Sequence, residues 1–219
     1  MNYKLSPSSL SLMHDCPRCF WLEKHKVWQR PAGIFPSLPS GMDRILKIHF
    51  DKFRDRGMLP PELCTNHDCS SMRLFGINED ERELLKVWRD GLKGVRWQDK
   101  AGNVLCGAVD TLLVKDKKLI VLDYKTRGFP LRENTHEYYK DQIDIYTFLL
   151  RKNGFETEDF GFLLFYFPDK VLETGEVLFE TKLIKLNVNI KNAEELFMKG
   201  LRVLEGDCPR ETCEWCERV

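Results

Sequence analysis

Length, composition and charge limit the classes to which this chain can belong. A chain of 219 residues can bury a core without disulfides and lies near the upper size for one core. The 34 basic and 34 acidic residues cancel, which excludes an overall positive field, so any nucleic-acid surface must be local. The longest apolar run, residues 160–167, has the length of a strand and excludes a transmembrane helix, so no membrane partner is expected.

The first expected helix carries two cysteines. Ser6 and Pro7 are typical of a helix start, with a capping side chain followed by proline at the first helical position, and the helix reaches Cys16 and Cys19. A proline-rich stretch, residues 31–39, ends it. The chain has eight cysteines and no N-terminal apolar signal segment, which favours a reducing cytoplasm and metal thiolates over disulfides.

A second helix is expected over residues 42–56. His49 lies on it among apolar residues at helical spacing. A loop over residues 60–71 follows, and a third helix begins near Asn78. The loop holds three residues that form either a small metal site or an ordinary polar loop: Cys64, His67 and Cys69.

Two apolar runs joined by a short polar turn predict a β-hairpin. The runs cover residues 104–114 and 119–124, and Asp116 and Lys117 form a two-residue loop between them. The loop length fixes which residues of the two strands face each other.

This register brings two carboxylates and a lysine together. Asp110 faces Asp123, with Cβ atoms about 4.5–5.5 Å apart, and Lys125 lies on the same face of the sheet. Two carboxylates at that distance repel each other, and a bound Mg²⁺ or Mn²⁺ removes the repulsion. The hairpin therefore predicts a divalent metal site, and the alternative is a surface hairpin with an ordinary Asp–Lys pair.

The next expected helix has a polar stripe. Tyr138, Gln142 and Tyr146 are spaced by four residues and share one face. An amide between two phenols suits the wall of a polar cleft, and the alternative is a pair of half-buried tyrosines beside a solvated amide. Arg127 and Tyr139 are the expected local contacts to nucleic acid, through charge and through stacking on a base.

The last expected elements lead to a second C-x-x-C pair. Two strands, over residues 160–167 and 177–186, precede an amphipathic helix over residues 192–204. Two such cysteine pairs, near the two ends of the chain, can close one metal site. The expected set is Cys16, Cys19, Cys213 and Cys216, with Cys208 as the alternate for one of them. Iron–sulfur and Zn²⁺ both fit four thiolates, and the alternative is buried cysteines without a metal.

Three motifs along the chain resemble those of one nuclease family. They are Gly-x-x-Asp ending at Asp110, Asp-x-Lys from Asp123 to Lys125, and Gln-x-x-x-Tyr from Gln142 to Tyr146. In this order and spacing they resemble the RecB-like branch of the PD-(D/E)XK nuclease superfamily, which includes recombination exonuclease modules and CRISPR-adaptation nucleases. The resemblance implies an α/β, restriction-endonuclease-like core with a mixed sheet flanked by helices.

The resemblance also implies a role for each motif. Asp110 and Asp123 hold the metal, with the carbonyl of Tyr124 as a further ligand. The family often has an earlier His or Glu ligand on a helix, and His49 is the candidate here, with Asp51 as a weaker substitute; the alternative for His49 is a packed or capping residue. Lys125 is the third catalytic residue, which orients or helps to deprotonate the attacking water. Gln142 and Tyr146 contact the substrate near the site, in addition to Arg127 and Tyr139, which are expected from charge and stacking and not from the resemblance. Several members hold an iron–sulfur cluster between one early cysteine and a C-terminal trio. This chain has two early cysteines, and the resemblance favours iron–sulfur, with structural Zn²⁺ as the alternative.

The expected organisation is a single domain over residues 1–219. It comprises a helical N-terminal lobe (1–100), a catalytic sheet and helix (101–190), and a C-terminal helix with a cysteine tail (191–219). The expected function is that of a divalent-metal-dependent DNA exonuclease on single-stranded or frayed DNA, in repair, recombination or mobile-element defence, with a helicase or integrase partner. The alternatives are a non-catalytic module that binds nucleic-acid ends and a metal-stapled scaffold for protein partners.

Overall fold

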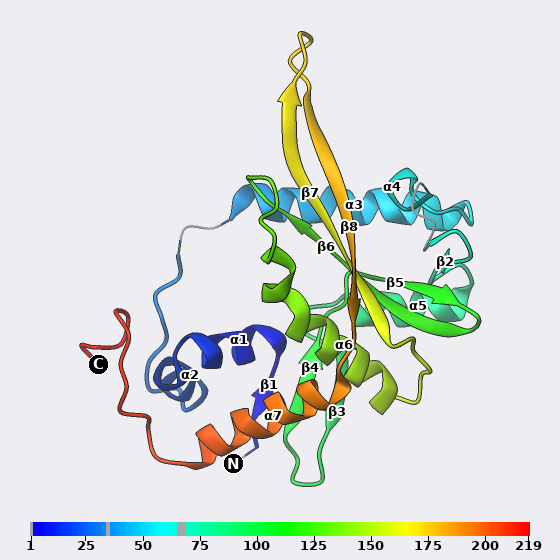
Figure 1. Ribbon diagram of the computed structural model, residues 1–219. Coiled ribbons are helices and arrows are strands. Elements are labelled where there is room, and N and C mark those ends of the chain that lie inside the picture. The colour runs from blue at the N-terminus through cyan, green and yellow to red at the C-terminus, as the bar shows by residue number, and fades with distance from the viewer. Residues whose placement is uncertain (1, 34–35, 65–68) are drawn as a thin grey trace.

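The computed structural model describes residues 2–33, 36–64 and 69–219. Its largest layer is a five-stranded sheet in the order β2–β5–β6–β7–β8 (Figure 1). β6 and β7 run parallel and the other neighbours antiparallel, so the expected mixed sheet is confirmed. The strands are β2 (Arg73–Leu74), β5 (Thr111–Lys115), β6 (Lys118–Thr126), β7 (Phe160–Val171) and β8 (Val177–Asn187).

A smaller sheet of three strands and a set of helices complete the described structure. The small sheet has the order β1 (Lys4–Leu5), β4 (Val104–Gly107) and β3 (Val95–Gln98). Residues 1–100, expected to be helical, thus also supply β1, β2 and β3. The helices are α1 (Pro7–Asp15), α2 (Pro17–Lys24), α3 (Ser37–Asp55), α4 (Pro61–Cys64), α5 (Glu79–Trp88), the 3-10 helix η2 (Thr135–Tyr139), α6 (Lys140–Lys152) and α7 (Ile190–Glu205).

Helices cover both faces of the large sheet (Figure 1). α6 contacts β3 and β4 of the small sheet as well as β6, and its residues from Ile143 to Leu150 are all buried. On the other face, α3 places Leu46 and Phe50 in a cluster with Leu122 of β6. Because side chains alternate along a strand, Asp123 points to the α6 side of β6.

The predicted hairpin register is confirmed. β5 and β6 pair antiparallel with Lys115 opposite Lys118. The loop residues Asp116 and Lys117 have φ values of 47° and 68°, which is typical of the tight hairpin turn that suits the right-handed twist of the strands. The acidic residues therefore lie in the relationship expected from the sequence.

Two expected elements are divided in the structure. Residues 104–114 do not form one strand, because the chain leaves the small sheet after Gly107 and enters the large sheet at Thr111. The first helix is likewise interrupted at Cys16, whose φ and ψ are −161° and 106°. Pro17 follows, and proline disfavours a helical conformation in the residue before it, so α2 starts anew.

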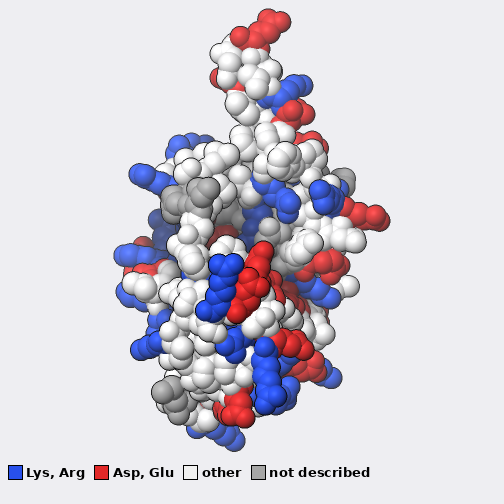
Figure 2. Space-filling model, turned by 90° about the vertical axis from the view of Figure 1, so that its left-hand side faces the viewer, with Lys and Arg blue, Asp and Glu red and all other residues white. Residues whose placement is uncertain are grey.

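The β7–β8 hairpin projects well beyond the body of the protein (Figures 1 and 2). In the part of the chain that the structure describes, no helix is long and apolar enough to cross a membrane.

Helix α3 begins at Ser37, before its expected start, and α5 begins as expected after the capping side chain of Asn78. Of the three residues considered as a small metal site, His67 lies outside the described residues.

Candidate active site

Asp110 and Asp123 meet at the point where the two sheets separate. Thr111 is the first β5 residue paired with β6, opposite Leu122, so Asp110 lies beside Asp123 at the end of the ladder. The Asp123 side chain is 2 % exposed and that of Asp110 is 19 % exposed. The structure thus brings the two predicted carboxylates together in a largely buried position.

Lysines from two elements approach these carboxylates. Lys125 Nζ lies 2.7 Å from Asp123 Oδ2, so the two side chains form an ion pair. Lys47 of α3 lies with Nζ 3.8 Å from Asp110 Oδ1 and 2.8 Å from Asp43 Oδ2. The sequence reasoning missed Asp43 and Lys47, although their spacing of four puts them on one helix face.

The surroundings of the pair change the pKa of both Asp110 and Lys125. Burial, and then the charge of Asp123, raise the pKa of Asp110 to about 8. Burial acts to lower the pKa of Lys125, but the charges of Asp123 and Asp110 outweigh it, so this pKa lies above its ordinary value. At neutral pH Lys125 is a cation, and Asp110 retains its proton until another cation displaces it.

The carboxylate pair fits a divalent metal ion. Its donors are hard oxygens, of the kind that Mg²⁺ and Mn²⁺ prefer. The raised pKa of Asp110 indicates that a second negative charge at this point lacks compensation in the protein alone. Asp110 and Asp123 would hold such an ion. The carbonyl of Tyr124 stays a prediction, while the Tyr124 ring packs on the opposite face against Phe50, with centroids 5.3 Å apart.

The structure places His49 in a different environment. Its Nε2 lies 3.0 Å from Glu62 Oε1 of α4, and its ring meets Phe53 edge to face. Tyr166 donates a hydrogen bond to the same Glu62 oxygen. On α3, His49 is two residues beyond Lys47 and therefore turned away from it by about 200°. The contacts described for His49 include those with Glu62 and Phe53, and none is with Asp110 or Asp123.

Asp51, the weaker candidate for a metal ligand, accepts hydrogen bonds from two arginines instead. Arg89 Nη1 lies 2.8 Å and 3.1 Å from its two oxygens, and Arg54 Nη1 also donates to it. Arg89 Nε donates to the carbonyl of Asp110 at 2.7 Å, and Arg54 Nη2 donates to Thr111 Oγ1 at 2.8 Å. Two guanidinium groups therefore stabilise the bend at Asp110, one through the Asp110 carbonyl and one through the Thr111 hydroxyl. Hydrophobic periodicity gives no signal for such contacts.

Replacing Arg89 should weaken metal binding while the fold is kept. We expect Arg89→Met to release the Asp110 carbonyl and to lower Mn²⁺ affinity by about 10–100-fold, the usual effect of losing a group that orients a ligand. Isothermal titration with Mn²⁺ measures this, with Lys86→Met on the exposed face of α5, the helix that ends just before Arg89, as the control. An unchanged affinity in Arg89→Met would show that the bend holds its position without this contact.

Gln142 and Tyr146 lie together beside the carboxylates. Gln142 Nε2 donates to the Tyr146 hydroxyl at 2.6 Å. Burial, and next the charge of Asp123, raise the pKa of Tyr146 above its ordinary value. The Tyr146 ring lies so close to Gly107 that a Cβ atom there would be 2.5 Å from it. The glycine of the Gly-x-x-Asp motif is thus explained by the space that Tyr146 needs.

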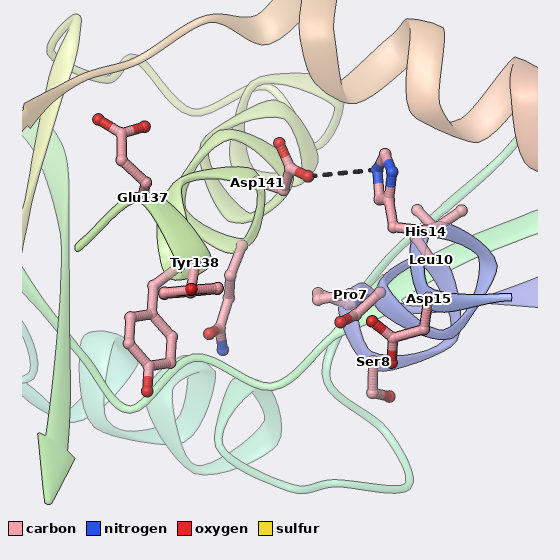
Figure 3. A pocket seen from close by; sticks show the side chains of 11 residues that line it. Pro7, Ser8, Leu10, His14, Asp15, Glu137, Tyr138 and Asp141 are labelled. Atoms are coloured by element: carbon pink, nitrogen blue, oxygen red, sulfur yellow. Dashed lines mark ion pairs between the residues drawn. The ribbon is translucent and has the colours of Figure 1, made fainter. Parts of the chain in front are cut away.

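A groove lies between α1 and the start of α6 (Figure 3). Its cavity has a volume of about 530 Å³, and His14 Nε2 and Asp141 Oδ2 face each other across it at 3.5 Å. A second cavity of about 270 Å³ shares Pro7, Ser8 and Gln142 with the first and reaches Tyr146. The two cavities thus adjoin along α1 and the start of α6, and the second also reaches Gly107 and Ala108 of the Gly-x-x-Asp motif.

The two predicted nucleic-acid contacts, Tyr139 and Arg127, lie in different surroundings. The Tyr139 ring centroid is 5.1 Å from Lys125 Nζ, whereas Arg127 lines another cavity, of about 520 Å³, with Phe129 and Tyr138. Figure 2 shows a hollow below the projecting hairpin with basic and acidic side chains interspersed around it. This mixture of charges agrees with the balanced composition of the chain.

The four predicted cysteines form one group that joins the ends of the chain. Their Sγ atoms all lie within 4.8 Å of one another. Cys16 Sγ is 3.8 Å from Cys216 Sγ, and Cys19 Sγ is 3.5 Å from Cys213 Sγ. In contrast, the Cys208 sulfur accepts a hydrogen bond from Arg18 Nη1 at 3.3 Å. The group fits a metal, and among the described residues Cys208 is not part of it.

Comparison with known proteins agrees with this geometry. The model of the PD-(D/E)XK nuclease superfamily matches residues 70–218, a span that contains Asp110, Asp123 and Lys125. Comparison with the curated proteins gave no match. With more than half of its length matched, and with its paired carboxylates and lysine at the junction of two sheets, the chain belongs to the PD-(D/E)XK nuclease superfamily.

Proposed function

We propose that this protein is a divalent-metal-dependent DNA nuclease of the RecB-like branch, which removes nucleotides from single-stranded or frayed ends. The observation that carries the proposal is the buried Asp110–Asp123 pair with Lys125 Nζ at 2.7 Å from Asp123. Mg²⁺ or Mn²⁺ bound there supplies polarisation of a phosphate and a lower pKa for an attacking water. Members of the PD-(D/E)XK superfamily are generally metal-dependent nucleases.

Lys125 acts as a fixed positive charge. Because its pKa is raised, it keeps its proton at neutral pH and is not the base that accepts a proton from water. Its ammonium group orients a water by hydrogen bonding and stabilises the negative charge that develops on the phosphate. Asp110 and Asp123 fix the cation, and Arg89 fixes the Asp110 carbonyl.

The groove between α1 and α6 suits a single strand. Tyr138 is 85 % exposed at its edge, and Tyr139 lies beside Lys125, so aromatic faces are available for unpaired bases. Gln142 lines both cavities and offers its amide to the substrate near the carboxylates. We place the activity in the cytoplasm, in repair, recombination or mobile-element defence, with a helicase or integrase that delivers the end.

Digestion of end-labelled DNA tests this function. We expect the parent protein with Mn²⁺ or Mg²⁺ to shorten single-stranded DNA from an end, faster than blunt duplex. Lys125→Ala should lose about 100-fold or more in rate, since it removes a preorganised charge. The control is Lys118→Ala, at the turn of the same hairpin. DNA binding without any product from the parent would favour the non-catalytic end-binding module.

A further inference from the structure

The spacing of the four sulfurs decides between a single ion and a cluster. A metal ion with four sulfurs at about 2.3 Å holds them at the corners of a tetrahedron whose edges are about 3.8 Å. Three separations in the group are 3.8, 3.5 and 3.8 Å, for Cys16–Cys216, Cys19–Cys213 and Cys213–Cys216. In a four-iron cluster each thiolate binds a different iron, so the sulfurs lie much farther apart.

We propose that Cys16, Cys19, Cys213 and Cys216 bind one structural zinc ion, in place of the iron–sulfur cluster that the family resemblance implies. Four protein thiolates would fill the tetrahedral coordination of zinc, as in structural zinc sites. Three of them are buried, since Cys16, Cys19 and Cys216 are 4 %, 1 % and 0 % exposed, and Cys213 is partly exposed.

Neighbouring donors stabilise the thiolates. The backbone N–H of Cys19 donates to Cys16 Sγ at 3.5 Å, and that of Cys213 donates to Cys216 Sγ at 3.4 Å. Arg30 Nη2 lies 3.7 Å from Cys213 Sγ. Four thiolates around one divalent ion carry excess negative charge, and these N–H groups and this guanidinium offset it.

Cys208 lies outside the group of four cysteines and contacts Arg18 instead. Arg18 Nη1 donates to its sulfur at 3.3 Å and to the carbonyl of Pro209 at 3.1 Å, while Arg18 Nη2 donates to the carbonyl of Val219 at 2.8 Å. Arg18 stands between the two cysteines of the first pair in the sequence. It therefore fastens the tail beside the ion without placing Cys208 among the ligands.

The ion fixes the position of α1. Cys16 ends α1 and, as the N-cap of α2, accepts a hydrogen bond from the backbone of Cys19. α1 forms one wall of the groove that Figure 3 shows. A zinc ion at Cys16 therefore holds this wall opposite α6, at a distance from the catalytic carboxylates.

Metal analysis of protein purified without exposure to air tests the proposal. We expect one zinc per chain, with neither iron nor acid-labile sulfide. Iron in place of zinc, with or without sulfide, would overturn it. The readout does not depend on nuclease activity, so failure of the proposed function and failure of the zinc site can be told apart.

Two cysteine variants identify the ligand set. Cys16→Ser should reduce bound zinc from one per chain to none, whereas the matched variant Cys208→Ser should keep it. The opposite pattern would correspond to one early cysteine with a C-terminal trio and would overturn the assignment. Should Cys16→Ser fail to fold, Co²⁺ exchanged into the parent and into Cys208→Ser provides the second measurement. Both should then give the same visible spectrum of a tetrahedral four-thiolate site, and loss of that spectrum in Cys208→Ser would contradict the proposal.

Discussion

Asp110→Asn and Asp123→Asn should each abolish DNA cleavage, with a rate loss of about 1,000-fold or more. Each change removes a metal ligand, and a Lewis-acid contact of several kcal/mol corresponds to at least that factor in rate. The measurement is single-turnover digestion of end-labelled single-stranded DNA with Mn²⁺. Asp116→Asn in the hairpin loop makes the same chemical change in a position with φ 47°, which asparagine tolerates, and should leave the rate unchanged.

The same variants should differ in stability when no metal is present. Asp110 has a raised pKa, so its charge is unfavourable in the folded state, and Asp110→Asn should match or exceed the parent in Tm in EDTA near pH 8. Asp123→Asn removes the partner of Lys125 and should be less stable than the parent. Mn²⁺ should raise the Tm of the parent but of neither variant. Full cleavage by either variant would show that the carboxylate pair is not part of the active site.

Mn²⁺ affinity should rise steeply with pH up to about 8 and then level off. Below that value Asp110 carries a proton, and a metal ion must displace it, so affinity should change by about tenfold per pH unit. The measurement is a series of Mn²⁺ titrations between about pH 6 and pH 9. Asp110→Asn should bind weakly at every pH, without this slope. A flat profile in the parent would contradict the raised pKa.

The stability of the metal-free protein should show the complementary trend. The folded pKa of Asp110 is raised above its value in the unfolded chain, so between the ordinary carboxyl range and about pH 8 the folded state binds more protons than the unfolded state. The free energy of unfolding should therefore decrease as pH rises through this window. Saturating Mn²⁺ should remove the decrease, because the bound ion compensates the charge.

Local rules predicted the central hairpin. A two-residue turn determines strand register, so the opposition of Asp110 and Asp123 followed from the sequence of residues 104–125 alone. The capping side chains of Ser6 and Asn78 marked helix starts in the same way. The C-x-x-C spacing also brought four cysteines together, because two thiols so placed reach a common point.

Contacts between distant segments could not be predicted in this way. Nothing in the local sequence shows that β4 and β5 belong to different sheets, or that α6 contacts both sheets through β3, β4 and β6. The orientation of α3 put Asp43 and Lys47 near Asp110 and gave His49 a different partner, Glu62. The support of the Asp110 bend by Arg89 depends on where α5 packs, which only the tertiary structure establishes.

The carboxylate pair and the cysteine group differ in how much of the chain must close to form them. The carboxylates lie on neighbouring strands joined by a tight turn, and strands so connected pair quickly because little loop entropy is lost. The cysteine group instead joins Cys16 to Cys216 and encloses nearly the whole chain. Residues 213–216 follow the hairpin in the sequence, so during synthesis the cysteine group can close only after the strands that carry the carboxylates have been made.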